Sequence, residues 1–206
     1  IWNGTAWGTE GSGVTTGNVI RFVEAAPAPT RDEYAVATIN ASADADVQIY
    51  NGTTDTFGNI AEIDDTISDI LSHGIDIAYE SDSGDLMAVS CDGTEAVYRV
   101  WNGTSWSATS SISLVITGNC EWIRLASDPS TDEIVMVVRN DITGGVDYQA
   151  LVWNGSSWGN SVFFGSQAPA NDEGMAVEYE ESGAEAIVVV ANGTNASFLY
   201  DRWNGS

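Results

Sequence analysis

One phrase recurs along the chain, and its spacing constrains the fold more than any other feature. It reads IWNGTAWG at 1–8, VWNGTSWS at 100–107 and VWNGSSWG at 152–159, with a looser copy, IYNGTTDTFG, at 49–58 and a truncated copy, RWNGS, at 202–206. The repeated asparagines are separated by 48, 51, 52 and 50 residues; they are Asn3, Asn51, Asn102, Asn154 and Asn204. A period near fifty residues is typical of a propeller, a solenoid or another repeat array.

Each copy of the phrase predicts a β-hairpin with an aromatic pair on one face. Asn-Gly between two apolar runs is the strongest short-range signal for a two-residue type I′ turn. That turn places Trp101 opposite Thr104, and Trp106 becomes a diagonal neighbour of Trp101 on the same face. We therefore expect these aromatic residues to fill the space between neighbouring repeats: Trp2, Trp7, Tyr50, Phe57, Trp101, Trp106, Trp153, Trp158 and Trp203.

Each fifty-residue unit also predicts four short strands. In the second unit, apolar or alternating runs cover 75–80, 85–91 and 96–101, and a fourth run follows each phrase, as at 157–164. Val, Ile, Tyr and Trp dominate these runs, as strands prefer. Four antiparallel strands per fifty residues is the blade of a β-propeller. We therefore predict an all-β chain in which residues 1–206 form one four-bladed β-propeller.

The closing blade has two interpretations. Residues 5–25 predict an outermost strand without inner strands of its own, and the unit 174–205 has three inner strands and stops at the turn. Joining the two closes the ring within one chain, and we favour this. The same strand could instead complete a blade of a neighbouring molecule by β-strand addition. The repeat pattern also fits one unit of a longer tandem array.

The chain is strongly acidic. It carries 30 Asp and Glu residues against 6 arginines, with no lysine, and its formal net charge is −24. Such a surface repels nucleic acid and anionic lipid, and no apolar run is long enough to span a membrane, so we expect neither partner. Acidic loops suit calcium, although a solvated acidic turn is the simpler interpretation of each loop. The candidate calcium ligands are Asp44, Asp46, Asp82, Asp85, Asp128, Asp132, Asp141 and Asp147.

Cysteines and sequons point to an oxidising compartment. Cys91 and Cys120 fall at strand ends that face the same side of adjacent blades, so they predict a disulfide; the alternative is two buried free thiols. The bond would contribute about 3–4 kcal/mol and would fit an extracellular or cell-surface protein. In such a protein Asn-X-Ser/Thr triplets are glycosylation candidates. They are Asn3, Asn40, Asn51, Asn102, Asn154, Asn192, Asn195 and Asn204.

The sequence offers no catalytic set. His73 is the sole histidine, lies in a Ser-His-Gly loop, and is expected to be a solvent-exposed turn residue. Glu33, Asp85, Glu133 and Glu185 occupy the same place in the four units, where we expect them to hold backbone amides of the first hairpin turn. Because an active site usually breaks repeat symmetry, we expect a protein that is not an enzyme.

The stretch IAYESDSGDLMAVSCDGTEAVYRVWNGTSWS at 77–107 resembles the repeats of uncharacterised secreted or cell-surface β-propeller proteins of bacteria and archaea. In those repeats an AYE-x-x-SG run leads into a YR-x-WNG-x-x-W hairpin. The first unit departs from this pattern, with Pro27 and Pro29 in its turn and Tyr50 in place of Trp. The resemblance implies a propeller outside the cytoplasm and implies no activity.

Three classes of function follow. We expect a non-catalytic extracellular structural or adhesive propeller that self-associates, as a homopolymer or with tandem neighbours, into a filament or surface layer. The alternative is a carbohydrate-binding, lectin-like propeller, which requires exposed aromatic residues and makes glycans the partners. A second alternative is a fragment of a secreted hydrolase, which requires an asymmetric acidic cluster at the channel mouth.

Overall fold

The computed structural model describes residues 4–67, 69–115, 118–142, 145–166, 173–181, 185–193 and 196–205. Within these ranges the regular elements are strands in four antiparallel sheets, and each sheet follows chain order. The first sheet contains β1 (Ile20–Pro27), β2 (Glu33–Asn40), β3 (Ala45–Asn51) and β4 (Thr56–Asp64). The second contains β5 (Ile75–Tyr79), β6 (Leu86–Asp92), β7 (Glu95–Trp101) and β8 (Ser110–Ile112). The third contains β9 (Asn119–Ser127), β10 (Glu133–Ile142), β11 (Gly145–Asn154) and β12 (Trp158–Ser166), and the fourth contains β13 (Met175–Tyr179), β14 (Ala186–Asn192) and β15 (Ser197–Trp203).

Most predicted runs are strands. The runs at 75–80, 85–91, 96–101 and 157–164 are found as β5, β6, β7 and β12, with ends that shift by one or two residues. The outermost strand predicted over residues 5–25 is wrong: residues 8–19 are irregular, and β1 begins at Ile20 as the innermost strand of the first sheet. The glycines of this segment explain the difference, since they weaken strands and Gly17 takes a φ of 83°.

The repeated phrase forms a wider hairpin than the predicted two-residue turn. Trp101 lies directly opposite Trp106 rather than opposite Thr104, and in the third sheet Trp153 pairs with Trp158. The aromatic pair is therefore a direct cross-strand pair, with ring centroids 5.6 Å apart in the second sheet.

The side chain of Asn102 explains the wider loop. Its Oδ1 accepts hydrogen bonds from the amides of Thr104 and Ser105 at 3.0 and 2.9 Å. Of the Asn-Gly dipeptide, Gly103 takes a positive φ, 86°, and Asn102 does not. The predicted type I′ turn is wrong because the asparagine closes the loop through its side chain, as an Asx turn does.

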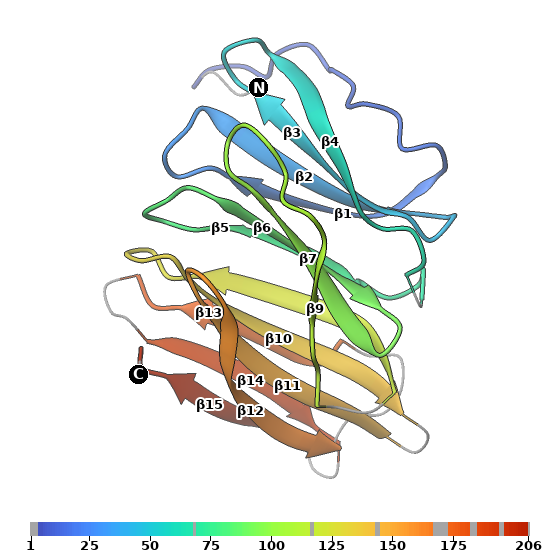
Figure 1. Ribbon diagram of the computed structural model, residues 1–206, viewed down its shortest axis with the longest axis vertical. Helices are drawn as coiled ribbons and strands as arrows, with labels where there is room; N and C mark the ends of the chain where they lie inside the picture. The colour runs from blue at the N-terminus through green and yellow to red at the C-terminus, as the bar shows by residue number, and fades with distance from the viewer. Residues whose placement is uncertain are drawn as a thin grey trace.

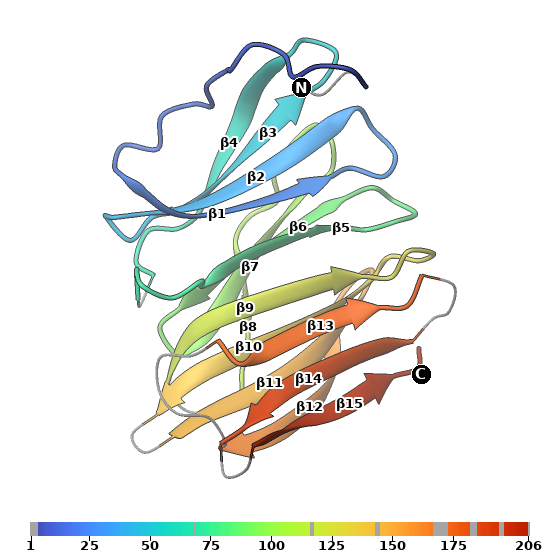
Figure 2. The ribbon, with the colours of Figure 1, turned by 180° about the vertical axis from the view of Figure 1, so that it is seen from behind.

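The four sheets pack face to face in an open row (Figures 1 and 2). The innermost strands β1, β5, β9 and β13 lie side by side in that order. The first and fourth sheets lie at opposite ends of the longest axis, so the row does not close. The arrangement is β-propeller-like, and the closed four-bladed ring expected from the sequence is not confirmed.

An apolar layer fills each boundary between sheets, because side chains alternate along a strand and each central sheet buries both faces. Residues of the first boundary include Ile39, Leu86 and Trp101. Residues of the second boundary include Met87, Ile123 and Met136. Residues of the third include Val137, Tyr148 and Val188. Among the described residues, none belongs to a helix long and apolar enough to cross a bilayer.

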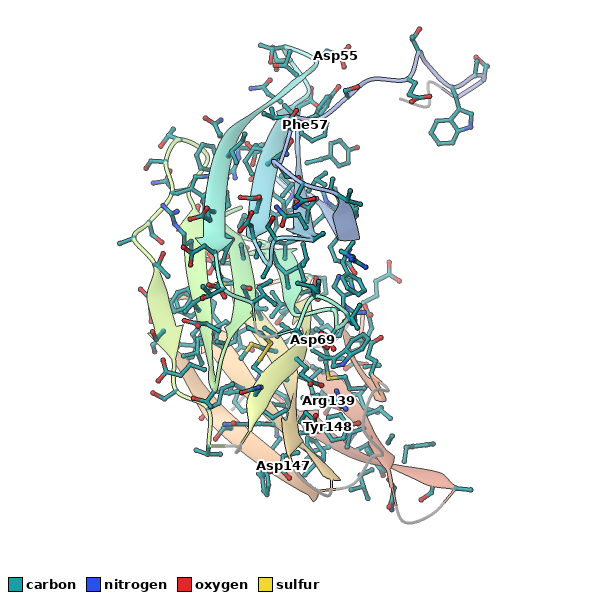
Figure 3. The ribbon with its side chains drawn as sticks, turned by 90° about the vertical axis from the view of Figure 1, so that its right-hand side faces the viewer. Asp55, Phe57, Asp69, Arg139, Asp147 and Tyr148 are labelled. Atoms are coloured by element: carbon teal, nitrogen blue, oxygen red, sulfur yellow. A yellow bond between two sulfur atoms is a disulfide. The ribbon has the colours of Figure 1, made fainter. Side chains whose placement is uncertain are left out.

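A disulfide crosses the second boundary. It joins Cys91 of β6 to Cys120 of β9, with their Cα atoms 5.2 Å apart, and its sulfur atoms are drawn in yellow in Figure 3. In the same view Phe57 lies at the end of the molecule formed by the first sheet, whereas Arg139 and Tyr148 lie toward the opposite end.

Candidate functional site

Each boundary between sheets is crossed by a hydrogen bond from a tryptophan of the repeated phrase to a glutamate of the preceding sheet. The indole Nε1 donates to a carboxylate oxygen in three pairs: Trp101 with Glu33 at 3.1 Å, Trp153 with Glu80, and Trp203 with Glu133 at 3.1 Å. A buried indole N–H needs an acceptor, and a charged acceptor gives the stronger bond. These pairs are called the tryptophan–glutamate ties below.

The ties correct the role expected for the repeated carboxylates. Glu33 accepts hydrogen bonds from Trp101 and from the Tyr79 hydroxyl, at 2.9 Å for the latter, rather than from turn amides. In the second sheet the acceptor is Glu80, on the other side of the turn from Asp85. Asp85 occupies the place of Glu33 in its repeat, and its side chain is one methylene shorter, so the acceptor in the second sheet is Glu80 instead. Glu185 forms an ion pair with Arg202 at 3.0 Å.

In the second and third sheets the aromatic residues lie as cross-strand pairs on the faces that meet the preceding sheet. Trp153 and Trp158 have ring centroids 5.7 Å apart, and Tyr98 of the second sheet packs edge-on against both, at 5.7 and 6.4 Å. Tyr50 and Phe57 form the corresponding pair of the first sheet, at 5.2 Å. Of the remaining predicted packing residues, Trp106 and Trp203 are half-buried, Trp7 is 79% exposed, and Trp2 lies outside the described residues.

A mixed-charge group joins the innermost strands; we call it the axial cluster, and it consists of Glu24, His73, Asp76, Arg124 and Glu173. Arg124 Nε lies 2.5 Å from Glu173, and Arg124 Nη1 lies 3.5 Å from Glu24 and 3.1 Å from Nδ1 of His73. Glu24 lies in β1, Asp76 in β5 and Arg124 in β9, whereas His73 precedes β5 and Glu173 precedes β13. The axial cluster therefore connects all four repeats.

His73 is buried, so its expected exposed position is wrong. Its ring stacks on Phe22 with centroids 4.9 Å apart, and Nε2 lies 3.3 Å from Glu24 Oε1. Burial, helped by the charge of Arg124, lowers the pKa of His73 to about 4. The imidazole is therefore neutral at physiological pH, and its Nδ1 is the acceptor for the guanidinium of Arg124.

Asp76 ties two innermost strands together. Its carboxylate accepts backbone hydrogen bonds from Ile77 within β5 and from Leu125 of β9, both at 2.8 Å. Burial raises the pKa of Asp76 to about 7, although the two backbone bonds and Arg124 act in the opposite direction. Asp76 is therefore a buried connector whose charge depends on pH near neutrality.

A cleft of about 500 Å³ lies along the innermost strands near the axial cluster. Ala25, Ile77 and Leu125 line it with the side chains of Tyr79 and Glu178. Burial and the carboxylate of Glu33 raise the pKa of Tyr79, whose hydroxyl donates to Glu33. The tyrosine hydroxyl is thus a protonated donor to the carboxylate of the tie between the first two sheets.

The predicted calcium ligands are distributed over several turns. Among the described residues, no three His, Cys, Asp or Glu side chains gather in a group that could hold a metal ion. Asp44 accepts a hydrogen bond from Asn40 at 2.8 Å. Burial, then the charges of Asp44 and Glu62, raise the pKa of Asp46 to about 6.

The other predicted ligands serve turns or lie apart. Asp132 Oδ1 accepts the amides of Asp82 and Ser83 across a sheet boundary, at 2.9 and 2.8 Å. The buried Asp128 accepts the amide and hydroxyl of Ser130. Burial raises the pKa of Asp85. Asp147 is buried in β11, and Asp141 is half-buried in β10.

The sequon asparagines differ in accessibility. Asn51, Asn102, Asn154 and Asn204 are exposed, and Asn192 is half-buried. Asn40 is 0% exposed, and its amide donates to Thr16 and Asp44, so this structure leaves no room for a glycan there. Asn3 and Asn195 lie outside the described residues.

Sequence reasoning missed the axial cluster apart from its histidine. Glu24, Asp76 and Arg124 occupy matching positions in β1, β5 and β9, where their partners are Ala37, Val89 and Val137. A charged residue inside the first apolar run of these three units was the available signal. The contact between the runs depends on how neighbouring sheets pack, which the repeat pattern alone does not give.

Comparison with known proteins adds little to this geometry. No family model matches the chain, and no curated protein is significantly similar to it. Among solved structures, the chain is similar to a mutant NanB sialidase from Streptococcus pneumoniae, with 13% sequence identity and a TM-score of 0.42 over 83% of this chain. The match covers 28% of the sialidase chain. A likeness of this size identifies neither a family nor an activity.

Proposed function

We propose that this chain is a non-catalytic structural propeller module that acts outside the cell and self-associates into a filament or surface layer. One observation carries the proposal: the outer face of the fourth sheet repeats a face that the second sheet buries, yet it is uncovered. Met87 is 1% exposed beneath the third sheet, whereas Ile187, at the matching position of β14, is 40% exposed. A face built like a buried boundary favours the addition of a further sheet.

The polar groups of the axial cluster and of the ties form hydrogen bonds and ion pairs, and this supports a structural role. In the axial cluster Arg124 is shared among two glutamates and a neutral histidine, and Asp76 accepts two backbone amides. In the tryptophan–glutamate ties, likewise, the carboxylates accept hydrogen bonds across the boundaries between sheets. Groups committed to such contacts stabilise the boundaries between sheets.

An extracellular location fits the chemistry of the boundaries. The disulfide Cys91–Cys120 is of a kind that persists in oxidising compartments. Calcium remains the proposed ion for the acidic loops, which include Asp44 and Asp46; burial, and then repulsion by the charges of Asp44 and Glu62, raises the pKa of Asp46 to about 6. A bound divalent cation would relieve that repulsion.

Electron microscopy and sedimentation of the native protein, with and without a calcium chelator, test the proposed function. We expect ordered filaments or sheets that loosen when calcium is removed. Discrete particles of the chain mass at all concentrations, unchanged by chelation, would contradict self-assembly.

Carbohydrate binding is the second candidate, because aromatic side chains are exposed on the end sheets. Tyr34 and Tyr200 are 50% and 61% exposed. An exposed aromatic ring can stack on the apolar face of a sugar. A glycan-binding screen on wild type and Tyr200→Ala tests this role: sugar-specific binding that depends on Tyr200 supports it.

A further inference from the structure

The uncovered face of the fourth sheet can be compared, residue by residue, with the face that the second sheet buries. Tyr98 pairs with Val89 in the second sheet, and Tyr200 pairs with Val189 in the fourth. The backbone agrees: the amide of Cys91 donates to Gly74 O at 2.8 Å, and the amide of Ala191 donates to Gly174 O at 2.6 Å. In strand register Tyr200 and Ala191 therefore match Tyr98 and Cys91, and Ala191 is half-buried and also packs against the third boundary.

The second sheet shows what such a face receives. Tyr98 packs edge-on against the aromatic pair Trp153 and Trp158 of the third sheet. Close by, Cys91 is bonded to Cys120 of the third sheet. A partner for the fourth sheet must therefore present an aromatic cross-strand pair near Tyr200 and a small or apolar side chain near Ala191.

The same chain carries that partner surface on its first sheet. Tyr50 and Phe57 form the aromatic cross-strand pair, with Tyr34 beside Tyr50 at 6.2 Å. Ile20, opposite Asn40, stands where Cys120 stands opposite Asn140. Ile20 is 46% exposed, so this position is open to a neighbour.

The segment before β1 shows that the first sheet is fitted to follow another sheet. The amide of Val14 donates to Gln48 Oε1 at 2.8 Å, and Asn40 Nδ2 donates to Thr16 O at 2.9 Å. At the second boundary, the segment that leads from β8 to β9 makes analogous contacts: Val115 N donates to Gln149 Oε1 at 2.9 Å, and Asn140 Nδ2 donates to Gly118 O at 3.0 Å. Residues 13–18 thus contact the first sheet in the way that the segment between β8 and β9 contacts the third sheet.

A cleft on the fourth sheet is a further feature that suits an aromatic residue of the partner. At one end of β13, β14 and β15, a cleft of about 310 Å³ on the fourth sheet is lined by residues that include Glu180, Glu185, Ile187 and Arg202. Glu185 and Glu180 correspond to Glu33 and Glu80, which accept aromatic donors from the next sheet at the internal boundaries. In the fourth sheet Glu185 is 44% exposed and its ion-pair partner Arg202 is 63% exposed, so an aromatic hydroxyl or indole can reach this carboxylate.

We propose that the fourth sheet of one molecule docks on the first sheet of a second copy of this chain, with Tyr200 against the partner's Tyr50 and Phe57. The contact places Ala191 beside the partner's Ile20 and repeats the boundary between the second and third sheets. It propagates head to tail, because one molecule contacts one neighbour through its fourth sheet and another neighbour through its first sheet. This inference rests on the proposed self-association and specifies its surfaces.

The double variant Ala191→Cys with Ile20→Cys tests the contact, because it recreates the position of the native disulfide across the new boundary. Under mild oxidation we expect covalent dimers and higher multimers on a non-reducing gel. Peptide mapping of mixed isotope-labelled and unlabelled copies should place the 191–20 bond between molecules. Ala191→Cys with Val23→Cys is the matched control, and we expect it to link at least tenfold more slowly.

Two single variants keep the test valid if the double variant misfolds. Ala191→Cys and Ile20→Cys, each with an intact Cys91–Cys120 bond, should form a mixed dimer only when combined. A further Tyr200→Ala change should slow this linking at least tenfold, whereas Phe163→Ala, at an exposed site on β12, should not.

A bond within one chain would instead show that the row closes into a four-bladed ring and would overturn the proposal. Linking no faster than in the control pair would also overturn it. If the wild type still forms filaments in that case, self-association stands and only these surfaces are wrong.

Discussion

The indole of Trp101 donates a hydrogen bond to the carboxylate of Glu33, a residue 68 positions earlier in the chain, at 3.1 Å. Trp101 is 3% exposed, so the bond crosses the first boundary in a largely dry environment. Equivalent bonds at the next two boundaries make the repeated phrase a means of fastening each sheet to the one before it. The phrase therefore serves both local hairpin formation and long-range packing.

Removing this N–H while keeping an aromatic ring should be costly. Trp101→Phe leaves a buried carboxylate with one donor fewer and a smaller side chain, and we expect a loss of about 2–4 kcal/mol in the free energy of unfolding. Trp106→Phe is the control, because Trp106 is less buried and its indole donates to the backbone carbonyl of Asn59. Urea denaturation measures both; equal losses would contradict a special role for the carboxylate.

The disulfide should contribute substantially to stability. The bond closes a loop between residues 29 positions apart, and loop-closure entropy gives about 3–4 kcal/mol for this length. We expect Cys91→Ser with Cys120→Ser to lower the free energy of unfolding by this amount and to remove the effect of added reductant. Unchanged stability in the double variant would show that packing at the second boundary suffices.

Asp76 should make stability depend on pH. Its pKa is raised to about 7 in the folded protein from an ordinary value of 3.8, so the folded state holds this proton more tightly than the unfolded state. The contribution is fully present below about pH 4 and is lost as the pH rises through about 7. From pH 5 to pH 8 it amounts to a loss of about 2–3 kcal/mol.

Asp76→Asn should remove that part of the pH dependence. Denaturation at pH 5 and pH 8 gives the difference for each variant, and we expect it to change by about 2–3 kcal/mol relative to wild type. Asp65→Asn, at an exposed position after β4, should leave the difference unchanged. His73 acts in the opposite direction, because its lowered pKa destabilises the fold as the pH falls from about 6.5 toward 4. A variant with the wild-type profile would show that Asp76 does not titrate near neutrality.

Self-association should strengthen with ionic strength. The net charge of −24 makes copies repel one another, and salt screens charges more than about 10 Å apart at 0.1 M. We expect the association constant to rise several-fold between 0.05 and 0.5 M sodium chloride, as measured by light scattering. Calcium compared at equal ionic strength separates specific binding from screening. Association that weakens with salt would indicate a contact dominated by ion pairs.

The sequence predicted those features that depend on local pattern. The period of the Asn-Gly phrase and the short apolar runs, such as 85–91, were enough for the strands and their antiparallel order. The loop around Asn102 was misjudged, because the asparagine side chain competes with the backbone turn that Asn-Gly usually favours. The positions of His73 and Arg124 depend on the angle between sheets, and a repeat pattern does not define that angle.

Self-association through the fourth sheet is tested most directly by sedimentation velocity over a series of protein concentrations for wild type, Ile187→Asp and Phe163→Asp. Both substitutions place a carboxylate at an exposed apolar site, 40% and 51% exposed respectively, but only Ile187 lies on the uncovered face of the fourth sheet. If the fourth sheet is the contact surface, wild type and Phe163→Asp form larger species as concentration rises, whereas Ile187→Asp stays monomeric. Monomers of all three at every concentration, or assembly that Ile187→Asp does not weaken, would contradict it.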